Sequence, residues 1–216
     1  MVLAGIECSP KILDFRANGI PDQERVGYID TLSPPETADF QLLSLKGGKR
    51  MNETVTIRPL EERDIKRCLE IYNYYIENTT VTFEEVPLSY EDFHKRLTCI
   101  AADYPFLVAE DGGTVIGYAY LDKYNPRSAY RYTADLSVYF DKSAVLRGCG
   151  SRIYAALEKE AVKREFKNIV SLITADNAAS IAFHKKQGFN AAGLLCNVGL
   201  KFGKTLSVAI YQKEIG

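Results

Sequence analysis

The sequence predicts an α/β protein in which one mixed sheet of about seven strands carries helices on both faces. Three observations support this class. Strand patterns and amphipathic helix patterns take turns along the chain. The glycine-rich segment 145–151 joins a strand pattern directly to a helix pattern. Asp111-Gly112-Gly113 joins two strand patterns, which is typical of a hairpin. These patterns place one domain at residues 51–216.

The composition excludes several classes of protein. The chain has 216 residues, of which 46% are hydrophobic, so it has ample material for a core. The balance of 27 basic against 28 acidic residues gives no electrostatic case for binding nucleic acid or an anionic membrane. No apolar run is long enough to cross a bilayer, and the N-terminus lacks the form of a signal peptide. We therefore expect a cytoplasmic protein.

The cysteines argue against disulfides and against a metal centre. Their number is odd, they are widely scattered, and they contain no Cys-x-x-Cys pair. Free thiols and no metal are therefore expected at Cys8, Cys68, Cys99, Cys149 and Cys196.

Residues 1–50 have a different character from the rest of the chain. They are rich in proline and glycine, show no sustained periodicity, and end in Lys46-Gly-Gly-Lys-Arg50 before Met51. Two interpretations remain open. The segment is a flexible or packed N-terminal extension, or it is translated upstream sequence with Met51 as the natural start. Lys-Gly-Gly shortly before a Met is what a purine-rich ribosome-binding site would encode.

The first half of the domain contains a strand, two helices and a hairpin. Thr54–Arg58 alternates as a strand and Asp64–Ile76 carries an apolar stripe, while Glu77–Phe83 suits a loop that lines a site. Ser89 begins a second helix that extends to about Cys99. The hairpin strands are Pro105–Glu110 and Val115–Tyr120.

The second half begins with the polar connection Asp122–Arg131 and the strand Tyr132–Phe140. Asn168–Thr174 is a near-continuous apolar run, which favours a buried, parallel strand. A short helix, Asn177–Gln187, ends at Gly188. Two further strand patterns close the chain, at Leu194–Leu200 and Leu206–Tyr211.

The glycine-rich segment is a candidate anion site. Gly148 and Gly150 open the helix pattern Arg152–Arg164 directly after a strand, so free backbone N–H groups and the helix dipole can face one phosphate. The alternative is a tight packing turn. The segment is neither a Walker loop, because no Gly-Lys-Ser/Thr follows, nor a complete dinucleotide fingerprint.

The element order, the glycine segment and the run from Asn177 through His184 to Phe189 together resemble the GCN5-related N-acetyltransferases (GNAT). The chain is most similar to the phosphinothricin and methionine sulfoximine acetyltransferase branch. The matching stretches are colinear and span Thr54 to Tyr211, with residues 1–50 outside. They are Tyr74–Phe83, Tyr104–Glu110, Arg127–Arg131, Tyr132–Tyr139 and Gly199–Gly203.

The resemblance implies a GNAT fold and transfer of an acetyl group from acetyl-CoA to a primary amine. It assigns the cofactor pyrophosphate to the backbone of Leu146, Arg147, Gly148, Cys149, Gly150 and Ser151. It also implies that a strand segment separates from the next parallel strand and pairs with the pantetheine arm, here Val138, Tyr139 and Phe140. Asn177 and Ser180 contact the same arm, and Asn177 also suits a helix cap.

Asp135 stands where this branch usually has Glu, the expected general base. Burial on an apolar strand would raise the pKa of the carboxyl, which suits a base. Because Asp is one methylene shorter, a bridging water enters the expectation. The alternative is a hydrogen-bonded structural Asp at a strand end.

His184 stands near the expected position of the leaving sulfur. An imidazole there would protonate or hydrogen-bond the thiolate, since its ordinary pKa is about 6.5. The alternative is a structural histidine on an amphipathic helix.

The resemblance places substrate recognition before Tyr132. Arg127 would pair with the carboxylate or phosphinate of an amino-acid-like substrate, and Tyr130 and Phe83 would wall the pocket. Asn125 and Pro126 would shape the same loop. The alternative for Arg127 is a solvated surface arginine.

Several residues depart from the family pattern. Val145 replaces a usual Gln or Arg, for which Arg147 compensates, and Thr205 and Ser207 replace a usual Trp and Asp. Cys149 lies at the start of a helix, which lowers a thiol pKa, although a catalytic or redox role is not required there.

The leading hypothesis is direct attack by a small amino-acid-like amine on acetyl-CoA in a ternary complex. One alternative is a different acceptor, a polyamine or a peptide N-terminus. Another is a non-catalytic acetyl-CoA-binding module, which the changes at Asp135 and Val145 keep open. A homodimer through the C-terminal strands is expected by family analogy.

Overall fold

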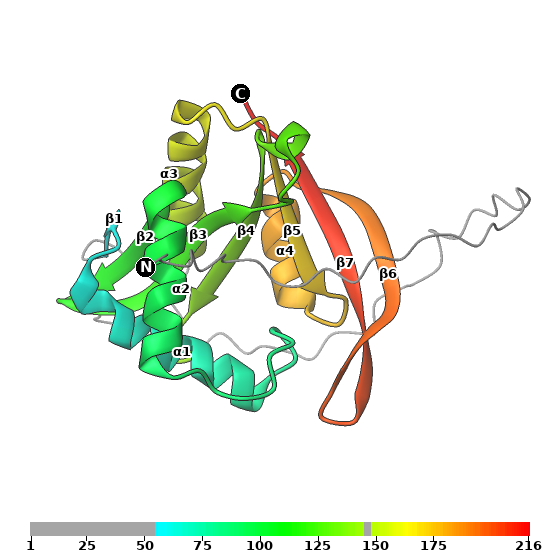
Figure 1. Ribbon diagram of the computed structural model, residues 1–216, viewed down its shortest axis with the longest axis horizontal. Helices are drawn as coiled ribbons and strands as arrows, with labels where there is room; N and C mark the ends of the chain where they lie inside the picture. The colour runs from blue at the N-terminus through cyan, green and yellow to red at the C-terminus, as the bar shows by residue number, and fades with distance from the viewer. Residues whose placement is uncertain (1–54, 145–147) are drawn as a thin grey trace, which may run out of the picture. The chain divides into compact units, whose positions relative to one another are not determined.

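The computed structural model describes residues 55–144 and 148–216, and its centre is a seven-stranded sheet in the order β1-β2-β3-β4-β5-β7-β6 (Figure 1). Neighbouring strands are antiparallel except β4 and β5, which are parallel. The strands are β1 (Thr56–Pro59), β2 (Phe106–Asp111), β3 (Thr114–Lys123), β4 (Thr133–Phe140), β5 (Asn168–Thr174), β6 (Asn190–Lys201) and β7 (Lys204–Glu214).

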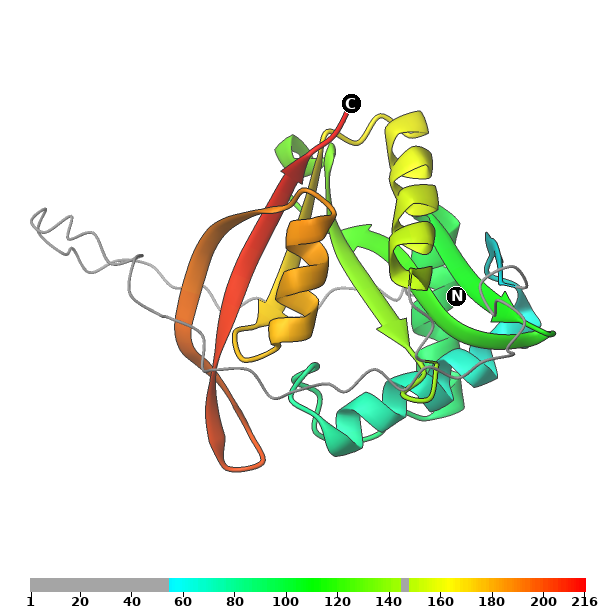
Figure 2. The same cartoon turned by 180° about the vertical axis from the view of Figure 1, so that it is seen from behind.

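The helices cover both faces of the sheet. α1 (Ile65–Asn78) and α2 (Tyr90–Asp103) lie on the face turned to the viewer in Figure 1. α3 (Cys149–Lys163) and α4 (Ala178–Lys186) lie on the opposite face, seen from the front in Figure 2. The mixed α/β fold with helices on both faces is therefore confirmed. Within residues 55–144 and 148–216, no helix combines the length and apolar character that crossing a membrane requires.

Strand alternation divides the buried side chains between two cores. Phe106 and Val108 of β2 pack with α1 and α2, whereas Leu107 and Ala109 point to the core beneath α3. Tyr118 on β3 belongs to the first core and Ala119 to the second. This alternation decides which side chains of β3 and β4 face α1 and α2.

The boundaries of α2 and α3 differ most from the predicted ones. α2 begins after Ser89, whose hydroxyl accepts the N–H of Asp92, but it extends beyond Cys99 to Asp103 because Ile100 continues its buried stripe. α3 begins at Cys149 rather than Arg152, so Gly150 lies inside the helix. Gly148 precedes it with φ of 97°, a conformation that glycine adopts without steric cost.

The prediction of a parallel, buried β5 was only partly correct. β5 pairs in parallel with β4 over three residue pairs, but it pairs antiparallel with β7 along its whole length. Leu172, in the middle of the run, is 54% exposed. An apolar run alone does not distinguish parallel from antiparallel neighbours.

The C-terminal hairpin is longer than predicted. β6 and β7 are joined through Phe202 and Gly203, whose φ values of 51° and 71° match the turn that suits the twist of a hairpin. β6 is an edge strand and is exposed over nearly all of its length. The predicted division between residues 1–50 and 51–216 falls outside the described residues and stays a prediction.

Candidate active site

The parallel strands β4 and β5 separate after Asp135. Their pairing consists of Thr133 with Asn168, Ala134 with Ile169, and Asp135 with Val170. Beyond this point the described part of β5 offers β4 no further ladder partner, although the Ser171 hydroxyl lies 3.4 Å from the Leu136 carbonyl. The separation opens a cleft of about 420 Å³ between the two strands. The predicted separation of these strands is thus present.

The cleft brings together most of the side chains predicted around the acetyl donor. The predicted residues that line it are Val138, Tyr139, Phe140, Gly150, Asn177, Ser180 and His184. Gly148, Cys149 and Ser151 do not line the cleft but lie beside Gly150 at the start of α3. Leu146 and Arg147 lie outside the described residues, so their predicted contacts stay predictions.

The N-terminus of α3 supplies backbone N–H groups beside this cleft. Among the described residues, Arg152 N–H is the first in this turn to bond, to the Gly148 carbonyl at 3.1 Å. The N–H groups of Cys149, Gly150 and Ser151 precede it, in the turn where an α-helix has no intrahelical acceptors. The helix dipole adds partial positive charge at the same place.

A second helix start faces the cleft from β5. Asn177 caps α4, because its side-chain oxygen accepts the N–H of Ser180 at 3.1 Å. The capping role expected for Asn177 is confirmed. The cap also fixes the position of Ser180, which lines the cleft.

His184 is buried on α4 with one nitrogen engaged and the other without a partner. Its Nδ1 lies 2.8 Å from the Ser180 carbonyl, which only accepts, so Nδ1 carries the hydrogen. Its Nε2 is buried and has no hydrogen-bond partner among the described residues. Burial lowers the imidazole pKa below its ordinary value. At neutral pH Nε2 is therefore an acceptor. The protonated imidazole that was expected to donate to the thiolate is not the form of His184 at rest.

Asp135 occupies the last paired position before β4 and β5 separate. Its Oδ1 is buried and has no hydrogen-bond partner among the described residues. Burial, followed by the charge of Asp122, raises its pKa to about 7, so burial has the effect expected for a base. Leu136 and Ser137, the next two residues, line the cleft. Asp135 itself is not among the residues that line the cleft, so the structure places its backbone, but not its carboxyl, at the start of the strand separation.

Tyr75 on α1 is a cleft residue that sequence reasoning missed. Its hydroxyl donates to the Phe140 carbonyl at 2.6 Å, and its ring packs near that of Tyr139, with centroids 5.6 Å apart. Tyr75 lies within the matching stretch Tyr74–Phe83, but the helix pattern gave it no separate role. Phe183 and Ser171 also line the cleft and were missed, because apolar and small residues in regular elements carry no local signal of function.

The five residues predicted around the acceptor do not lie together. Phe83 packs on Gly199 of β6, and the preceding Thr80 carbonyl accepts from Thr174 at the end of β5. The loop with Asn125, Pro126, Arg127 and Tyr130 precedes Tyr132, whose carbonyl accepts from Asn168 at the start of β5. The two groups therefore lie at opposite ends of β5, and none of the five lines the cleft.

Arg127 is exposed on its loop. The side-chain oxygen of Asn125 accepts the Arg127 N–H at 3.1 Å, which holds the start of the short turn Ser128–Tyr130. The Tyr130 ring packs edge-on against Tyr124 at 5.5 Å. The loop is thus ordered by its own side chains, and the predicted shaping role of Asn125 has a local basis.

Cys149 does not have the thiol environment that its place at a helix start suggested. Its side chain is fully buried, and burial raises the thiol pKa instead of lowering it. A reactive thiolate needs the opposite environment. Among the described residues, no cluster of His, Cys, Asp and Glu has a geometry that would hold a metal ion.

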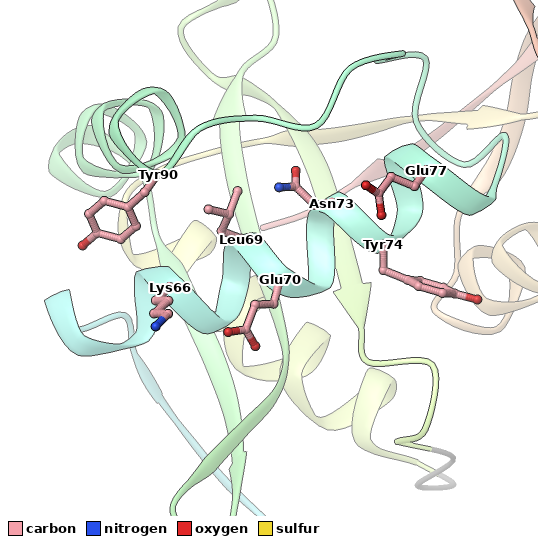
Figure 3. A pocket seen from close by; sticks show the side chains of 7 residues that line it. All are labelled: Lys66, Leu69, Glu70, Asn73, Tyr74, Glu77 and Tyr90. Atoms are coloured by element: carbon pink, nitrogen blue, oxygen red, sulfur yellow. The ribbon is translucent and has the colours of Figure 1, made fainter.

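A second cavity, of about 660 Å³, lies on the outer side of α1 (Figure 3). Its labelled side chains come from α1 and from Tyr90 at the start of α2. Glu70 there is already paired with Arg67 at 2.8 Å. This surface contains none of the predicted site residues, so the β4–β5 cleft is the stronger candidate for the active site.

Comparison with known proteins gives a consistent result. The family model described as acetyltransferase (GNAT) domain matches residues 57–207. Phosphinothricin N-acetyltransferase from Alcaligenes faecalis is 34% identical over 74% of this chain and 82% of its own length. L-methionine sulfoximine/L-methionine sulfone acetyltransferase from Pseudomonas paraeruginosa is 33% identical over 75% of this chain and 95% of its own.

Solved structures share the same arrangement. A phosphinothricin acetyltransferase from Sinorhizobium meliloti in complex with AcCoA aligns with a TM-score of 0.73 and 33% identity, covering 76% of this chain and 89% of that one. A ribosomal-protein-alanine N-acetyltransferase from Brucella melitensis aligns with a TM-score of 0.72 and 38% identity, covering 74% and 99%. The family match covers more than half of the sequence, and the chain therefore belongs to the GNAT acetyltransferase family.

Proposed function

We propose that this protein transfers an acetyl group from acetyl-CoA to the primary amine of a small amino-acid-like substrate. The observation that carries the proposal is the cleft that opens where β4 and β5 separate, immediately after Asp135, the last paired residue of β4, whose Oδ1 is buried. The names of the phosphinothricin and methionine sulfoximine relatives support the substrate class. The relative with bound AcCoA supports the donor.

The donor would lie along the cleft. The edge of β4 from Leu136 to Phe140 would pair with the pantetheine arm, and the free N–H groups at the start of α3 would hold the pyrophosphate. Asn177 and Ser180 would contact the arm from the start of α4. These assignments use backbone groups and helix starts, which the fold itself puts in place.

The reaction would proceed by direct attack in a ternary complex. Asp135, directly or through a water, would take a proton from the substrate ammonium, and the free amine would attack the thioester carbon. The C–S bond would then break, and CoA would leave as the thiolate. His184 Nε2, an acceptor at rest, would hydrogen-bond the thiol once the sulfur has been protonated. The buried thiol of Cys149, whose pKa is raised, supports a route without a covalent enzyme intermediate.

The acceptor would be recognised outside the cleft. In this proposal Arg127 pairs with the carboxylate or phosphinate of the substrate and Tyr130 forms an apolar wall beside it, whereas Phe83, at the opposite end of β5, would not contact the same small substrate. The exposure of Arg127 leaves its guanidinium accessible to an anion. A second candidate acceptor is a peptide N-terminus, which the name of the Brucella melitensis relative favours.

The test is the release of free CoA thiol over a panel of amines. The panel contains methionine sulfoximine, phosphinothricin, methionine sulfone, the standard amino acids, spermidine and a short peptide that begins with Ala. Turnover with the amino-acid analogues is expected. Turnover with spermidine or the peptide alone would overturn the substrate class, and acetyl-CoA binding without any turnover would indicate a non-catalytic module.

We also propose a homodimer formed through β6. Its large apolar side chains are exposed, with Leu194 at 57%, Val198 at 55% and Leu200 at 67%, and an uncovered edge strand favours pairing with a second chain. Sedimentation should give a dimer for the natural sequence and a monomer for Leu194→Glu/Leu200→Glu. Val162→Glu, on the exposed side of α3, is the matched control. A monomeric natural protein would contradict the proposal.

A cytoplasmic location is likewise a proposal. It is supported by the four cysteines of the described residues, all of which are free thiols. Cell fractionation with an antibody against the protein would test it, and recovery in a secreted or membrane fraction would contradict it.

A further inference from the structure

A second carboxylate, Asp122, lies beside the proposed base. Asp122 on β3 is directly opposite Asp135 in the antiparallel β3–β4 ladder. Opposed residues project from the same face, and their Cβ atoms are typically about 5 Å apart. Alternate residues of a strand share a face, so Tyr118, Tyr120 and Asp122 of β3 project from the same side of the sheet. Tyr118 packs in the core with α1 and α2, so those helices cover this face.

Two negatively charged carboxylates directly opposite each other repel, so the arrangement is destabilising unless a cation or a hydrogen bond compensates for it. Asp122 has partial compensation, since its Oδ1 accepts the N–H of Lys123 at 2.6 Å and the charges of Lys123 and Arg96 act on it. Among the described residues no comparable cation acts on Asp135, although a backbone hydrogen bond from Leu136 opposes the rise of its pKa. The ionisable groups that act on it are Asp122 and Tyr120 from β3 and Tyr139 from β4, while its β5 neighbour Val170 is apolar.

This asymmetry gives the two carboxyls different protonation states. Burial raises the pKa of both, but the cations near Asp122 and its backbone hydrogen bond oppose the rise there. Asp135, facing the negative charge of Asp122, reaches a pKa of about 7. Near neutral pH the pair therefore holds between one and two negative charges, and the proton that it exchanges resides mainly on Asp135.

We propose that Asp122 and Asp135 together receive the ammonium group of the acceptor, with Asp122 retaining its negative charge while Asp135 accepts the proton. This inference rests on the proposed function. The ammonium N–H bond breaks as the Asp135 O–H bond forms. The nitrogen lone pair then attacks the thioester carbon, the C–S electron pair leaves on the sulfur, and a second proton passes from the nitrogen to that thiolate, which gives a neutral amide and CoA thiol. No further reactant is needed.

The pair also accounts for the short side chain at position 135. A carboxylate that lacks one methylene reaches less far, and a second carboxylate from the neighbouring strand holds the ammonium within range of the first. Arg96 on α2 is paired with Glu84 at 2.8 Å, which restrains its guanidinium. The compensation of Asp122 is therefore incomplete, and its charge remains available to a cation.

The test combines a carboxyl titration with steady-state kinetics in Asp122→Asn. Protein labelled with ¹³C at the Asp carboxyls and free of ligand is titrated by NMR, with Asp135 assigned through Asp135→Asn. Removing the neighbouring charge should lower the Asp135 pKa from about 7 to about 6. The KM for the amine should rise about tenfold, with acetyl-CoA affinity unchanged. Asp103→Asn, at an exposed position of α2, is the control that should change neither.

Asp122→Glu keeps the charge and provides a second variant. It should retain a raised Asp135 pKa and an amine KM within about threefold of the natural protein. The inference is overturned if Asp122→Asn leaves both the titration and the KM unchanged, or if Asp122→Glu behaves like Asp122→Asn. The NMR titration requires no turnover. A natural protein that acetylates no amine would therefore contradict the proposed function, whereas an unchanged titration would contradict this inference alone.

Discussion

The two sides of β4 offer different chemical groups, mainly backbone on one side and side chains on the other. On the side of α3 and α4, the cleft is made by a strand separation, by two helix starts and by the backbone edge of β4, while Tyr75 of α1 lines it from the other side. On the side of α1 and α2, the proposed acceptor site consists of side chains, chiefly Asp135 and Asp122, with loops at the two ends of β5.

This difference separates the donor site, which the fold builds from backbone, from the acceptor site, which depends on the side chains of each protein. A backbone site for an invariant donor tolerates changes in side chain. A side-chain site for the acceptor changes with each substitution. The acceptor side is therefore where this protein should differ functionally from its relatives.

The largest effect should come from a substitution at Gly150 that fills part of the cleft. A Cβ placed on Gly150 would lie 3.1 Å from the Phe183 ring and 3.9 Å from that of Phe140, so Gly150→Val pushes a branched side chain into the cleft. Acetyl-CoA affinity measured by calorimetry should fall about 100-fold. Ala155→Val, at an exposed position of the same helix, controls for the β-branched residue. Equal loss of affinity in both variants would mean that the helix, not the cleft, was damaged.

A smaller effect is expected at His184. His184→Phe removes the Nε2 acceptor but keeps a ring between Phe183 and Phe189, so kcat should fall about tenfold while acetyl-CoA affinity is retained. ¹⁵N NMR of the natural protein should show a neutral ring with hydrogen on Nδ1 at pH 7. Because the pKa is lowered, the ring should gain charge only below its ordinary value of about 6.5. A doubly protonated ring at pH 7 would contradict this assignment.

The smallest effect is expected at Lys201, which holds a loop of the proposed acceptor side in place. Lys201 is 1% exposed and its Nζ donates to the Thr82 carbonyl at 2.8 Å, which ties the loop after α1 to β6. Lys201→Met keeps the length of the side chain but removes this bond, so the KM for the amine should rise about threefold. The exposed Lys204→Met is the control. A larger change in acetyl-CoA affinity than in the amine KM would contradict the assignment of Lys201 to the acceptor side.

The sequence was most informative where function depends on the backbone. Hydrophobic periodicity and the glycine segment located the strands and helices around the cleft, and the family resemblance gave Asn177, His184 and Asp135 as candidates. The opposition of Asp122 and Asp135 could not be predicted, since strand register depends on the whole hairpin. The direction of the pKa shifts at His184 and Cys149 also escaped prediction. Both follow from tertiary burial, which outweighs the local helix position.

The most direct test of the account is the pH dependence of acetyl transfer in the natural protein and in Asp135→Asn, with acetyl-CoA binding measured on the same samples. In the natural protein, kcat/KM should rise as pH increases through about 7, because Asp135 must lose its proton to act as a base. Asp135→Asn should bind acetyl-CoA normally and lose about 100-fold or more in kcat. Turnover by Asp135→Asn at the natural rate and with the same pH dependence would contradict the account.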